Sequence, residues 1–186
     1  MPKPITSFTG NAGEHFVLAE LLRRGVVAAL TPRNMPDFDV LATSGPRAAN
    51  IRVKTKTNAK TWLWHIPTSE QEKHPNAPWR RRVFPRLRAG GEGDFTALVD
   101  LQQERARYYV VPTRDIERRL QERHKTWVTT PGRGGRQRSM TNWERRLGDP
   151  DTDREWLSEY GSESGWQALI RYLDGHADSR SETRNQ

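Results

Sequence analysis

The chain of 186 residues contains no cysteine. This absence excludes disulfide bonds, zinc sites built on thiolates and cysteine nucleophiles. Long apolar runs are missing too: the first ten residues lack the hydrophobic stretch of a signal peptide, and no later stretch reaches membrane-spanning length. We therefore expect a cytoplasmic protein that does not enter a membrane.

Several sets of catalytic residues are also missing. The five histidines share no spacing suited to a metal, and the glycine-rich segment 132–135 lacks the Lys-Ser/Thr pair that a nucleotide-binding loop requires. No serine comes with a matching His and Asp. Chemistry driven by a nucleotide or by a nucleophilic side chain is therefore not expected.

Positive charge is what the chain has in excess. Its 31 Lys and Arg outnumber its 23 Asp and Glu, which gives a formal charge of +8. Such a surface attracts polyanions, because contacts with phosphates release condensed counterions. Acidic lipids and acidic proteins are alternative partners, but most of the excess is arginine, whose planar guanidinium suits phosphate. Nucleic acid, DNA in the first place, is the expected partner.

Hydrophobic periodicity predicts a helix and three strands in the first third of the chain. Apolar residues at helical spacing predict a helix from Asn11, its expected N-cap, to Gly25, its expected stop. Alternating and short apolar runs predict strands, and a Gly-Pro turn predicts that the second and third form a hairpin. The predicted strands are 26–30, 38–42 and 50–57.

The rest of the chain is predicted to add two strands and several helices. A basic loop at 68–93 precedes them, and a polar, disordered tail is expected at 174–186. Residues 1–173 are expected to form a single domain. Its further elements are strands 95–101 and 108–111, a helix 113–123 capped by Thr113, and a helical extension at 139–173 that packs through aromatic side chains.

Asp39 and Lys54 are the polar residues that stand out in the predicted strands. Asp is a poor strand former, so Asp39 is either an edge or turn residue or a functional carboxylate. Lys54 lies in the next strand, on the face opposite Ile51 and Val53, and the hairpin brings it within reach of Asp39. The pair can be a plain cross-strand ion pair. It can equally be a metal ligand beside a group that orients an attacking water.

Glu14 is the third candidate. It shares a face of the first predicted helix with Val17 and Leu21. Its spacing from Asn11 also fits a capping box, which requires nothing more than a helix start. Capping and catalysis both remain open for Glu14.

Together these residues resemble the PD-(D/E)XK nuclease superfamily, over roughly residues 10–147. The matching pieces are Gly13-Glu14 in the first helix, the segment 38–41 around Asp39 and the segment 51–56 around Lys54. The segments 108–112 and 124–127 are similar to that group as well. Each motif is short, and the resemblance rests on their order and spacing.

The resemblance implies an α/β, restriction-endonuclease-like fold. Its αβββαβ core has a mixed central sheet flanked by helices, here with extra C-terminal helices. It also implies hydrolysis of DNA phosphodiester bonds with Mg²⁺ or Mn²⁺, in restriction or repair. By resemblance, Asp39 and Glu14 hold the metal and Lys54 positions or activates the water. Nucleases of this core often work in pairs when they cut both strands, so a homodimer is one expectation.

Arg52 departs from the family pattern, which has Glu, Asp or Gln two residues before the lysine. An arginine removes one coordinating oxygen and adds positive charge beside the metal. Three consequences are open: Asp37 takes over part of the role, Arg52 turns to the phosphate, or the site no longer cuts.

Basic segments supply the substrate side of this hypothesis. Arginines beside a tryptophan at 79–82, and others in a glycine-rich loop, are typical of segments that contact phosphate, although a solvated surface is the alternative. The predicted nucleic-acid-binding residues are Arg52, Lys56, Arg80, Arg81, Arg82, Arg133 and Arg136.

Three functions are therefore consistent with the sequence. The first is a metal-dependent DNA nuclease. The second is a catalytically inactive module on the same fold that binds nucleic acid or a partner protein. The third is an interaction protein of a toxin or defence system with no nucleic-acid role.

Overall fold

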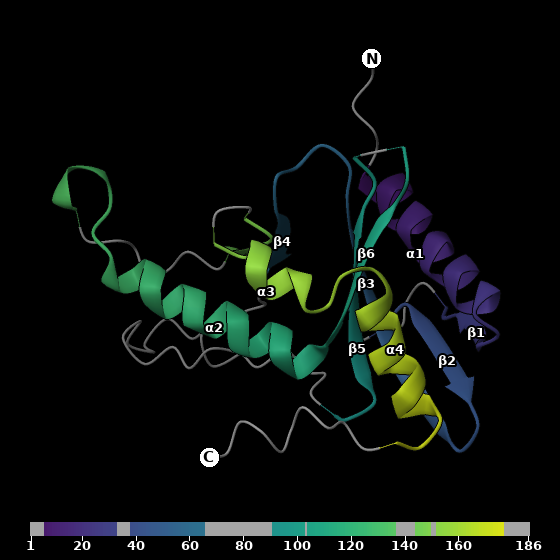
Figure 1. Cartoon of the computed structure of the whole chain (residues 1–186). Coiled ribbons are helices and arrows are strands. Elements are labelled where there is room, and N and C mark those ends of the chain that lie inside the picture. Colours follow the sequence, from purple (N-terminus) through teal and green to yellow (C-terminus); the bar gives the residue numbers. More distant parts are fainter. Residues whose placement is uncertain are drawn as a thin grey trace, which may run out of the picture.

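The computed structural model describes residues 6–32, 38–65, 91–102, 104–136, 144–149 and 152–176. In this part of the chain one helix is followed by a run of strands, and most of the remaining helices come after them (Figure 1). In chain order they are α1 (Thr6–Arg23), β1 (Val27–Leu30), β2 (Val40–Ser44), β3 (Arg47–Lys56), β4 (Trp62–His65), β5 (Asp94–Asp100), β6 (Arg107–Pro112), α2 (Thr113–Thr129), the 3-10 turn η2 (Arg133–Gly135), β7 (Glu144–Leu147), α3 (Arg154–Ser158) and α4 (Ser162–Leu173).

A mixed five-stranded sheet forms the centre, in the order β1-β2-β3-β5-β6. The first three strands run antiparallel to one another, β3 and β5 pair in parallel, and β5 and β6 form an antiparallel pair. This confirms the predicted order of one helix, three strands, a link, two strands and a helix. It also confirms an α/β fold with a mixed sheet flanked by helices.

Each face of the sheet has its own hydrophobic core. On one face, α1 and α4 cover Val40, Ile51 and Ala97 with side chains that include Val17 and Trp166. On the other, α2, α3 and the β4–β7 pair contribute a second cluster that includes Trp62, Leu98, Ile116 and Leu147. Because side chains alternate along β3, Ile51 faces the first core while Arg52 and Lys54 face the second side.

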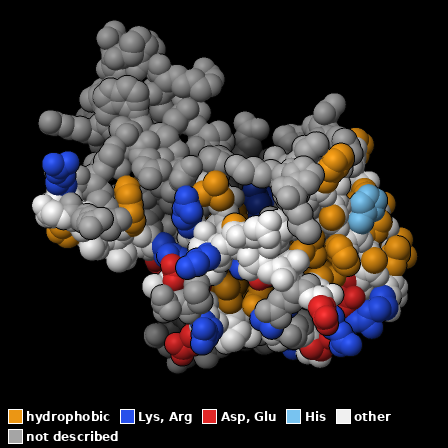
Figure 2. All heavy atoms as spheres, turned by 90° about the horizontal axis from the view of Figure 1, so that it is seen from above, with side chains coloured by type: hydrophobic (Ala, Val, Ile, Leu, Met, Phe, Trp, Pro, Cys, Tyr) orange, Lys and Arg blue, Asp and Glu red, His pale blue; other side chains and the backbone are white. Residues whose placement is uncertain are grey.

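Helix α1 begins five residues earlier than predicted, at Thr6, so the expected N-cap Asn11 lies inside it. Its end is as predicted: Gly25 has φ +77°, and the Val26 N–H donates to Leu21 O at 3.0 Å, which closes a Schellman motif. Phe8, Phe16 and Leu22 remain exposed on its outer side. Figure 2 shows hydrophobic side chains gathered on the side of the molecule where α1 lies.

The predicted hairpin is present between β2 and β3. Its register pairs Val40 with Ile51 and Ser44 with Arg47, and Gly45 turns the chain with φ +59°. This turn requires glycine because other residues rarely adopt a left-handed backbone.

A second, two-stranded sheet was not predicted. Residues 144–147 form strand β7 rather than part of a helical extension, and β7 pairs antiparallel with β4. The reason is packing. Trp62 and Trp64 of β4 and Leu147 of β7 are buried beside α2, and their buried backbone groups need hydrogen-bond partners, which the two strands give each other. The extension is helical further on, in α3 and α4.

Thr113 begins α2 but does not cap it, in contrast to the prediction. The N-cap is Pro112, and no side chain caps the helix. The Thr113 hydroxyl instead lies 3.0 Å from the hydroxyl of Thr96, and both threonines are buried. Helix α2 is also longer than predicted, ending at Thr129.

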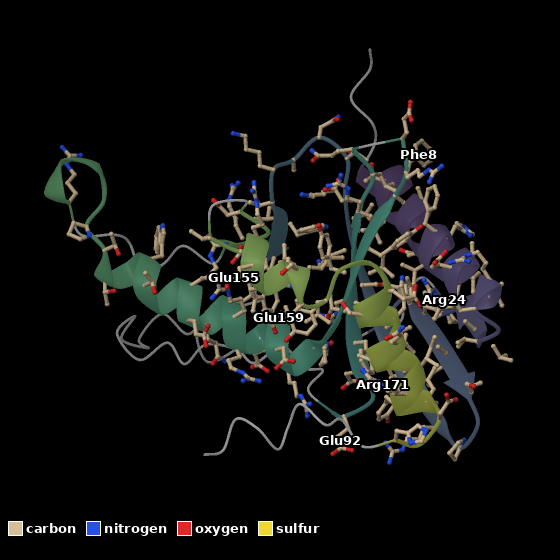
Figure 3. All side chains as sticks on the ribbon, in the orientation of Figure 1. Phe8, Arg24, Glu92, Glu155, Glu159 and Arg171 are labelled. Atoms are coloured by element: carbon tan, nitrogen blue, oxygen red, sulfur yellow. The ribbon has the colours of Figure 1, made fainter. Side chains whose placement is uncertain are left out.

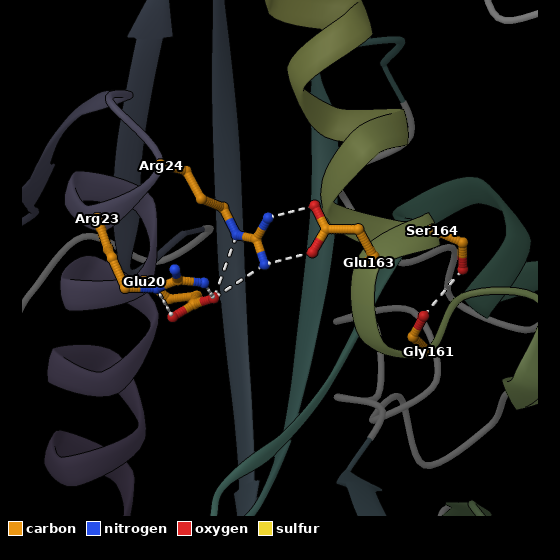
Figure 4. A network of polar contacts seen from close by, with 6 residues as sticks. All are labelled: Glu20, Arg23, Arg24, Gly161, Glu163 and Ser164. Carbon is orange, nitrogen blue, oxygen red and sulfur yellow. Dashed lines mark hydrogen bonds and ion pairs between the residues drawn. The ribbon is translucent and has the colours of Figure 1, made fainter.

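A polar network ties α4 to α1 (Figure 4). Arg24, which follows α1, donates from Nη2 to Glu163 Oε2 at 2.8 Å and to Glu20 Oε1 at 2.9 Å. Its guanidinium also lies 5.2 Å from the ring centroid of Trp166. Figure 3 shows Arg24 on the side of α1 that faces α4, with Phe8 near the other end of the helix.

Two predicted segments fall largely outside the described residues. The basic loop at 68–93 is described only from Gly91 onward, and the tail only as far as His176, whose N–H donates to Arg171 O at 2.9 Å. Among the described helices, none combines the length and the apolar character needed to cross a membrane.

Candidate active site

Asp39 lies directly before β2, which begins two residues later than the predicted strand 38–42, so Asp39 is outside the strand. Its backbone is fixed on both sides: its N–H donates to Ile51 O at 2.9 Å, and its carbonyl accepts the N–H of Thr31 at 3.0 Å. The carboxylate Oδ2 accepts the N–H of Val53 at 2.6 Å. This short, charge-assisted bond holds the carboxylate against β3 beside Lys54.

Lys54 is half-buried on the face of β3 that carries the second core. Its Nζ lies 5.7 Å from the ring centroid of Trp64. Burial lowers the pKa of Lys54, the positive charge of Arg52 lowers this pKa further, and the negative charge of Asp39 raises it. The charges of Arg52 and Asp39 therefore both act on Lys54, which agrees with the proximity of Asp39 and Lys54 that the hairpin predicts.

Arg52 lies opposite Asp39 and two residues before Lys54 on β3. The β2–β3 register pairs Val40 with Ile51, so the next step of the ladder sets Arg52 opposite Asp39. On its other side Arg52 pairs with Thr96 of β5. Its side chain is half-buried on the same face as Lys54. A guanidinium thus stands where the family pattern has an oxygen ligand, as the sequence indicates.

Glu14 lies in the third turn of α1 and not at its start, so the capping-box interpretation is wrong. Its side chain is half-buried. The charges that shift the pKa of Lys54 are those of Arg52 and Asp39, and Glu14 is not among them.

Close packing of α1 against β3 brings Glu14 to this end of the sheet. A Cβ at Gly13 would lie 1.8 Å from Thr55 Oγ1, which leaves no room for any side chain. Gly13 precedes Glu14, and Thr55 follows Lys54. Thr55 was not among the predicted site residues, although its alternation with Lys54 on β3 places it on the α1 side.

The predicted nucleic-acid-binding residues fall into three groups. Lys56 has partners inside the protein: its Nζ lies 3.0 Å from Asp100 Oδ2 and 4.1 Å from the ring centroid of Trp62. Arg136 is exposed after η2. Arg80, Arg81, Arg82 and Arg133 lie outside the described residues or side chains. The same is true of Asp37, which the sequence offers as a replacement for the missing oxygen ligand.

Metal-binding side chains are sparse at this site. In the described ranges, no three His, Cys, Asp or Glu residues form a group that could hold an ion. Asp39 is the carboxylate whose charge influences the pKa of Lys54. Its oxygens keep lone pairs in addition to the one that accepts the Val53 N–H. A metal at this position would rely on few protein ligands.

Comparison with solved structures places the fold. A bacterial homing endonuclease superposes with a TM-score of 0.50 at 11% sequence identity, over 93% of this chain and 96% of that chain. A Holliday junction resolvase of Archaeoglobus fulgidus has a TM-score of 0.42 at 18% identity, over 91% of this chain and 98% of that chain. No protein-family model and no curated protein matches the sequence. At this level of identity the homing endonuclease shares the fold with this chain, and the fold alone.

Proposed function

We propose that this chain, which has the restriction-endonuclease-like fold of the PD-(D/E)XK nucleases, is a metal-dependent nuclease that hydrolyses phosphodiester bonds of DNA. Its role is of the restriction or repair type. The proposal assigns the chemistry to Asp39, Lys54 and Glu14. The positive charge of the chain and of the site supports DNA as the substrate.

The observation that carries this proposal is that Asp39 is held against β3 beside the half-buried Lys54, whose pKa is lowered. Lys54 is half-buried, and burial favours its neutral amine. Such an amine loses its proton more readily than an exposed lysine and can accept a proton from water or orient a water by a hydrogen bond. Asp39 is held beside it by the Val53 N–H.

The described residues of the site are compatible with Mg²⁺. Mg²⁺ keeps several of its waters and binds through one or two carboxylates together with substrate phosphate. Asp39 supplies one such carboxylate and Glu14 is the candidate for the second. When bound, the ion lowers the pKa of a coordinated water and neutralises charge on the phosphate. With so few protein ligands, we expect Mg²⁺ or Mn²⁺ binding to be weak until DNA contributes its own oxygens.

Arg52 fits this proposal as a substrate-binding group. Arg52 adds a positive charge to the face of β3 that carries Lys54, opposite Asp39. This charge attracts a phosphodiester, and a planar guanidinium can bind two phosphate oxygens at once. Arg136 and the predicted arginines at 80–82 would extend the contact along the strand.

Cleavage of DNA by the wild-type protein tests the proposal. We expect Mg²⁺- or Mn²⁺-dependent hydrolysis that is lost in both Asp39→Asn and Lys54→Met. Binding of DNA, measured in parallel, should persist in Asp39→Asn, because that change removes a negative charge from the site. A wild-type protein that saturates with DNA and leaves it intact would exclude the nuclease.

A second candidate function is favoured by the charge of Arg52 and the few carboxylates. On this alternative the chain binds nucleic acid, or a partner protein, without cutting. Calorimetry with Mn²⁺ added to the protein–DNA complex separates the two: binding that disappears in Asp39→Ala supports the enzyme. DNA affinity that falls steeply with salt, with no difference in Mn²⁺ binding between the wild-type and Asp39→Ala complexes, supports the inactive module.

A further inference from the structure

Gly13 packs so closely against Thr55 that no residue with a side chain could take its place. A Cβ placed at Gly13 would lie 1.8 Å from Thr55 Oγ1, 2.9 Å from Thr55 Cβ and 3.0 Å from Thr55 Cγ2. Rotating the threonine does not relieve this contact, because its Cβ is fixed by the β3 backbone. The helix and the strand can therefore touch at this point only if residue 13 has no side chain.

This close approach lowers the stability of the fold at residue 13 of α1. The Thr55 hydroxyl is buried and has no hydrogen-bond partner among the described residues. A glycine inside a helix is also unfavourable. Gly10 lies three residues earlier in α1, and a Cβ there would meet no atom within 4 Å, so the close packing is specific to residue 13. A contact that costs stability is expected to serve another purpose.

The contact sits at the end of the sheet where Asp39 and Lys54 lie. Thr55 is the residue after Lys54, and Asp39 is bonded to Val53 two positions before Thr55. At about 100° per residue, Glu14 falls on the flank of α1 opposite Glu20, which takes part in the network with α4. Glu14 is thus on the flank turned away from α4, and it follows Gly13 at the stretch of β3 that extends beyond the pairing with β2.

We infer that Gly13 is a positioning residue: its missing side chain lets α1 rest on Thr55 and so places Glu14 over the Asp39 end of the site. A methyl group at residue 13 must push α1 away from β3. Glu14, the next residue, moves with the helix. The inference rests on the proposed function, since it gives Glu14 a part in the reaction.

Matched alanine variants and a rescue test this inference. Gly13→Ala and Gly10→Ala add the same methyl group to the same helix, once against Thr55 and once in open space. Thr55→Gly removes all three atoms that the new methyl would meet, so Gly13→Ala combined with Thr55→Gly should restore the approach. Each variant is compared by thermal unfolding, by DNA affinity and by the single-turnover rate of DNA cleavage at saturating DNA.

We expect Gly13→Ala to lower the single-turnover rate by about 10²-fold, the size that a displacement of about 1 Å can cause, with unchanged DNA affinity. Gly10→Ala should cut like wild type. If Gly13→Ala does not fold, the comparison is made in the Thr55→Gly background, where the methyl at residue 13 should cost no activity.

Two results would overturn the inference while leaving the proposed function intact. One is a folded Gly13→Ala that cuts as fast as Gly10→Ala. The other is a loss of rate in Gly13→Ala that Thr55→Gly does not reverse in the double variant. A wild-type protein that does not cut DNA at all overturns both proposals together, and is recognised before any variant is made.

Discussion

The carboxylate of Asp39 and the backbone of Val53 are joined by a hydrogen bond of 2.6 Å between Oδ2 and the amide nitrogen. This bond comes where the β2–β3 ladder has ended, since the last pair in register is Val40 with Ile51. The side chain of Asp39 thus takes over from the backbone of β2 and fixes the end of the hairpin. Because Val53 directly precedes Lys54, the same bond holds the carboxylate beside Lys54.

The first prediction separates the structural and the chemical role of Asp39. Asparagine keeps a side-chain oxygen that accepts the Val53 N–H, whereas alanine leaves that N–H without a partner. We expect Asp39→Ala to be less stable than Asp39→Asn by about 1–2 kcal/mol in urea unfolding. Both should lose Mn²⁺ binding in calorimetry. Equal stability of the two variants would show that the bond does not hold the hairpin end.

The second prediction concerns how stability depends on pH through Lys54. Because its pKa is lowered in the folded protein, the unfolded chain binds this proton more tightly than the folded chain. Stability should therefore rise with pH between the lowered pKa and the ordinary value of 10.5. Lys54→Met should remove this part of the slope and be more stable than wild type near pH 7. The free energy of unfolding, measured at several pH values, checks this.

Lys56 provides the contrast to Lys54 on the same face of β3. Its ammonium and the carboxylate of Asp100 are only 9% and 13% exposed and form an ion pair. Lys56→Met leaves Asp100 buried without its partner, so we expect a loss of about 3 kcal/mol at pH 7. If Lys56→Met stabilised the protein as Lys54→Met is expected to do, the distinction between the two lysines would be wrong.

The third prediction concerns how the α1–β3 contact affects the stability of the protein, measured separately from activity. Gly13→Ala should destabilise the protein by about 1–3 kcal/mol through overpacking. Gly10→Ala should stabilise it by about 0.5–1 kcal/mol, because alanine favours the helix and meets no neighbour. Thr55→Val replaces the buried hydroxyl with a methyl of similar size and should gain about 1 kcal/mol. Thermal unfolding of the three variants gives the order, and Gly13→Ala at or above wild type would refute the packing argument.

The fourth prediction concerns Asp153, which joins α2, α3 and the end of β7. Asp153 is 0% exposed and accepts hydrogen bonds from the N–H of Gly148 at 2.7 Å and from Arg119 Nε at 3.2 Å, with a further ion pair to Arg123. We expect Asp153→Ala to cost about 3–5 kcal/mol, because two buried or half-buried arginines lose their counter-charge. Denaturant unfolding measures the loss.

The matched control for Asp153 is Glu155→Ala on the same short helix. Glu155 is exposed on α3, as Figure 3 shows, and its removal should change stability by no more than about 0.5 kcal/mol. A large effect of Glu155→Ala would point to a general fragility of α3 instead of the Asp153 network.

Much of the central sheet could be predicted because its signal is local. The alternation of Ile51 and Val53 with Arg52 and Lys54 assigns each side chain to a face once the strand is recognised. The turn at Gly45 then fixes the hairpin and brings Lys54 near Asp39. Both steps depend on neighbouring residues, and both agree with the structure.

What could not be predicted depends on partners far away in the sequence. Trp62 and Leu147 belong to paired strands, but the register between β4 and β7 joins residues 79 to 85 positions apart. The partner of Lys56 is Asp100, which is set by the parallel register of β3 and β5. Neither pairing has a local pattern, and Lys56 therefore read as a free cation for nucleic acid.

The start of α1 was mispredicted for a different reason. Asn11 and Glu14 have the spacing of a capping box, and that pattern carries no information about packing. The helix continues to Thr6, and Gly13 is used for its contact with Thr55 instead of for a helix start. Tertiary packing overrode a local signal that was valid in itself.

The most direct test of the account is single-turnover cleavage of DNA by wild type, Lys54→Met and Lys56→Met under identical, saturating conditions with Mg²⁺ or Mn²⁺. The account predicts that wild type cuts, that Lys54→Met binds DNA but cuts at least about 10²-fold more slowly, and that Lys56→Met, where it folds, still cuts. Saturated DNA that wild type leaves intact, or a Lys54→Met variant that cuts as fast as wild type, would contradict it.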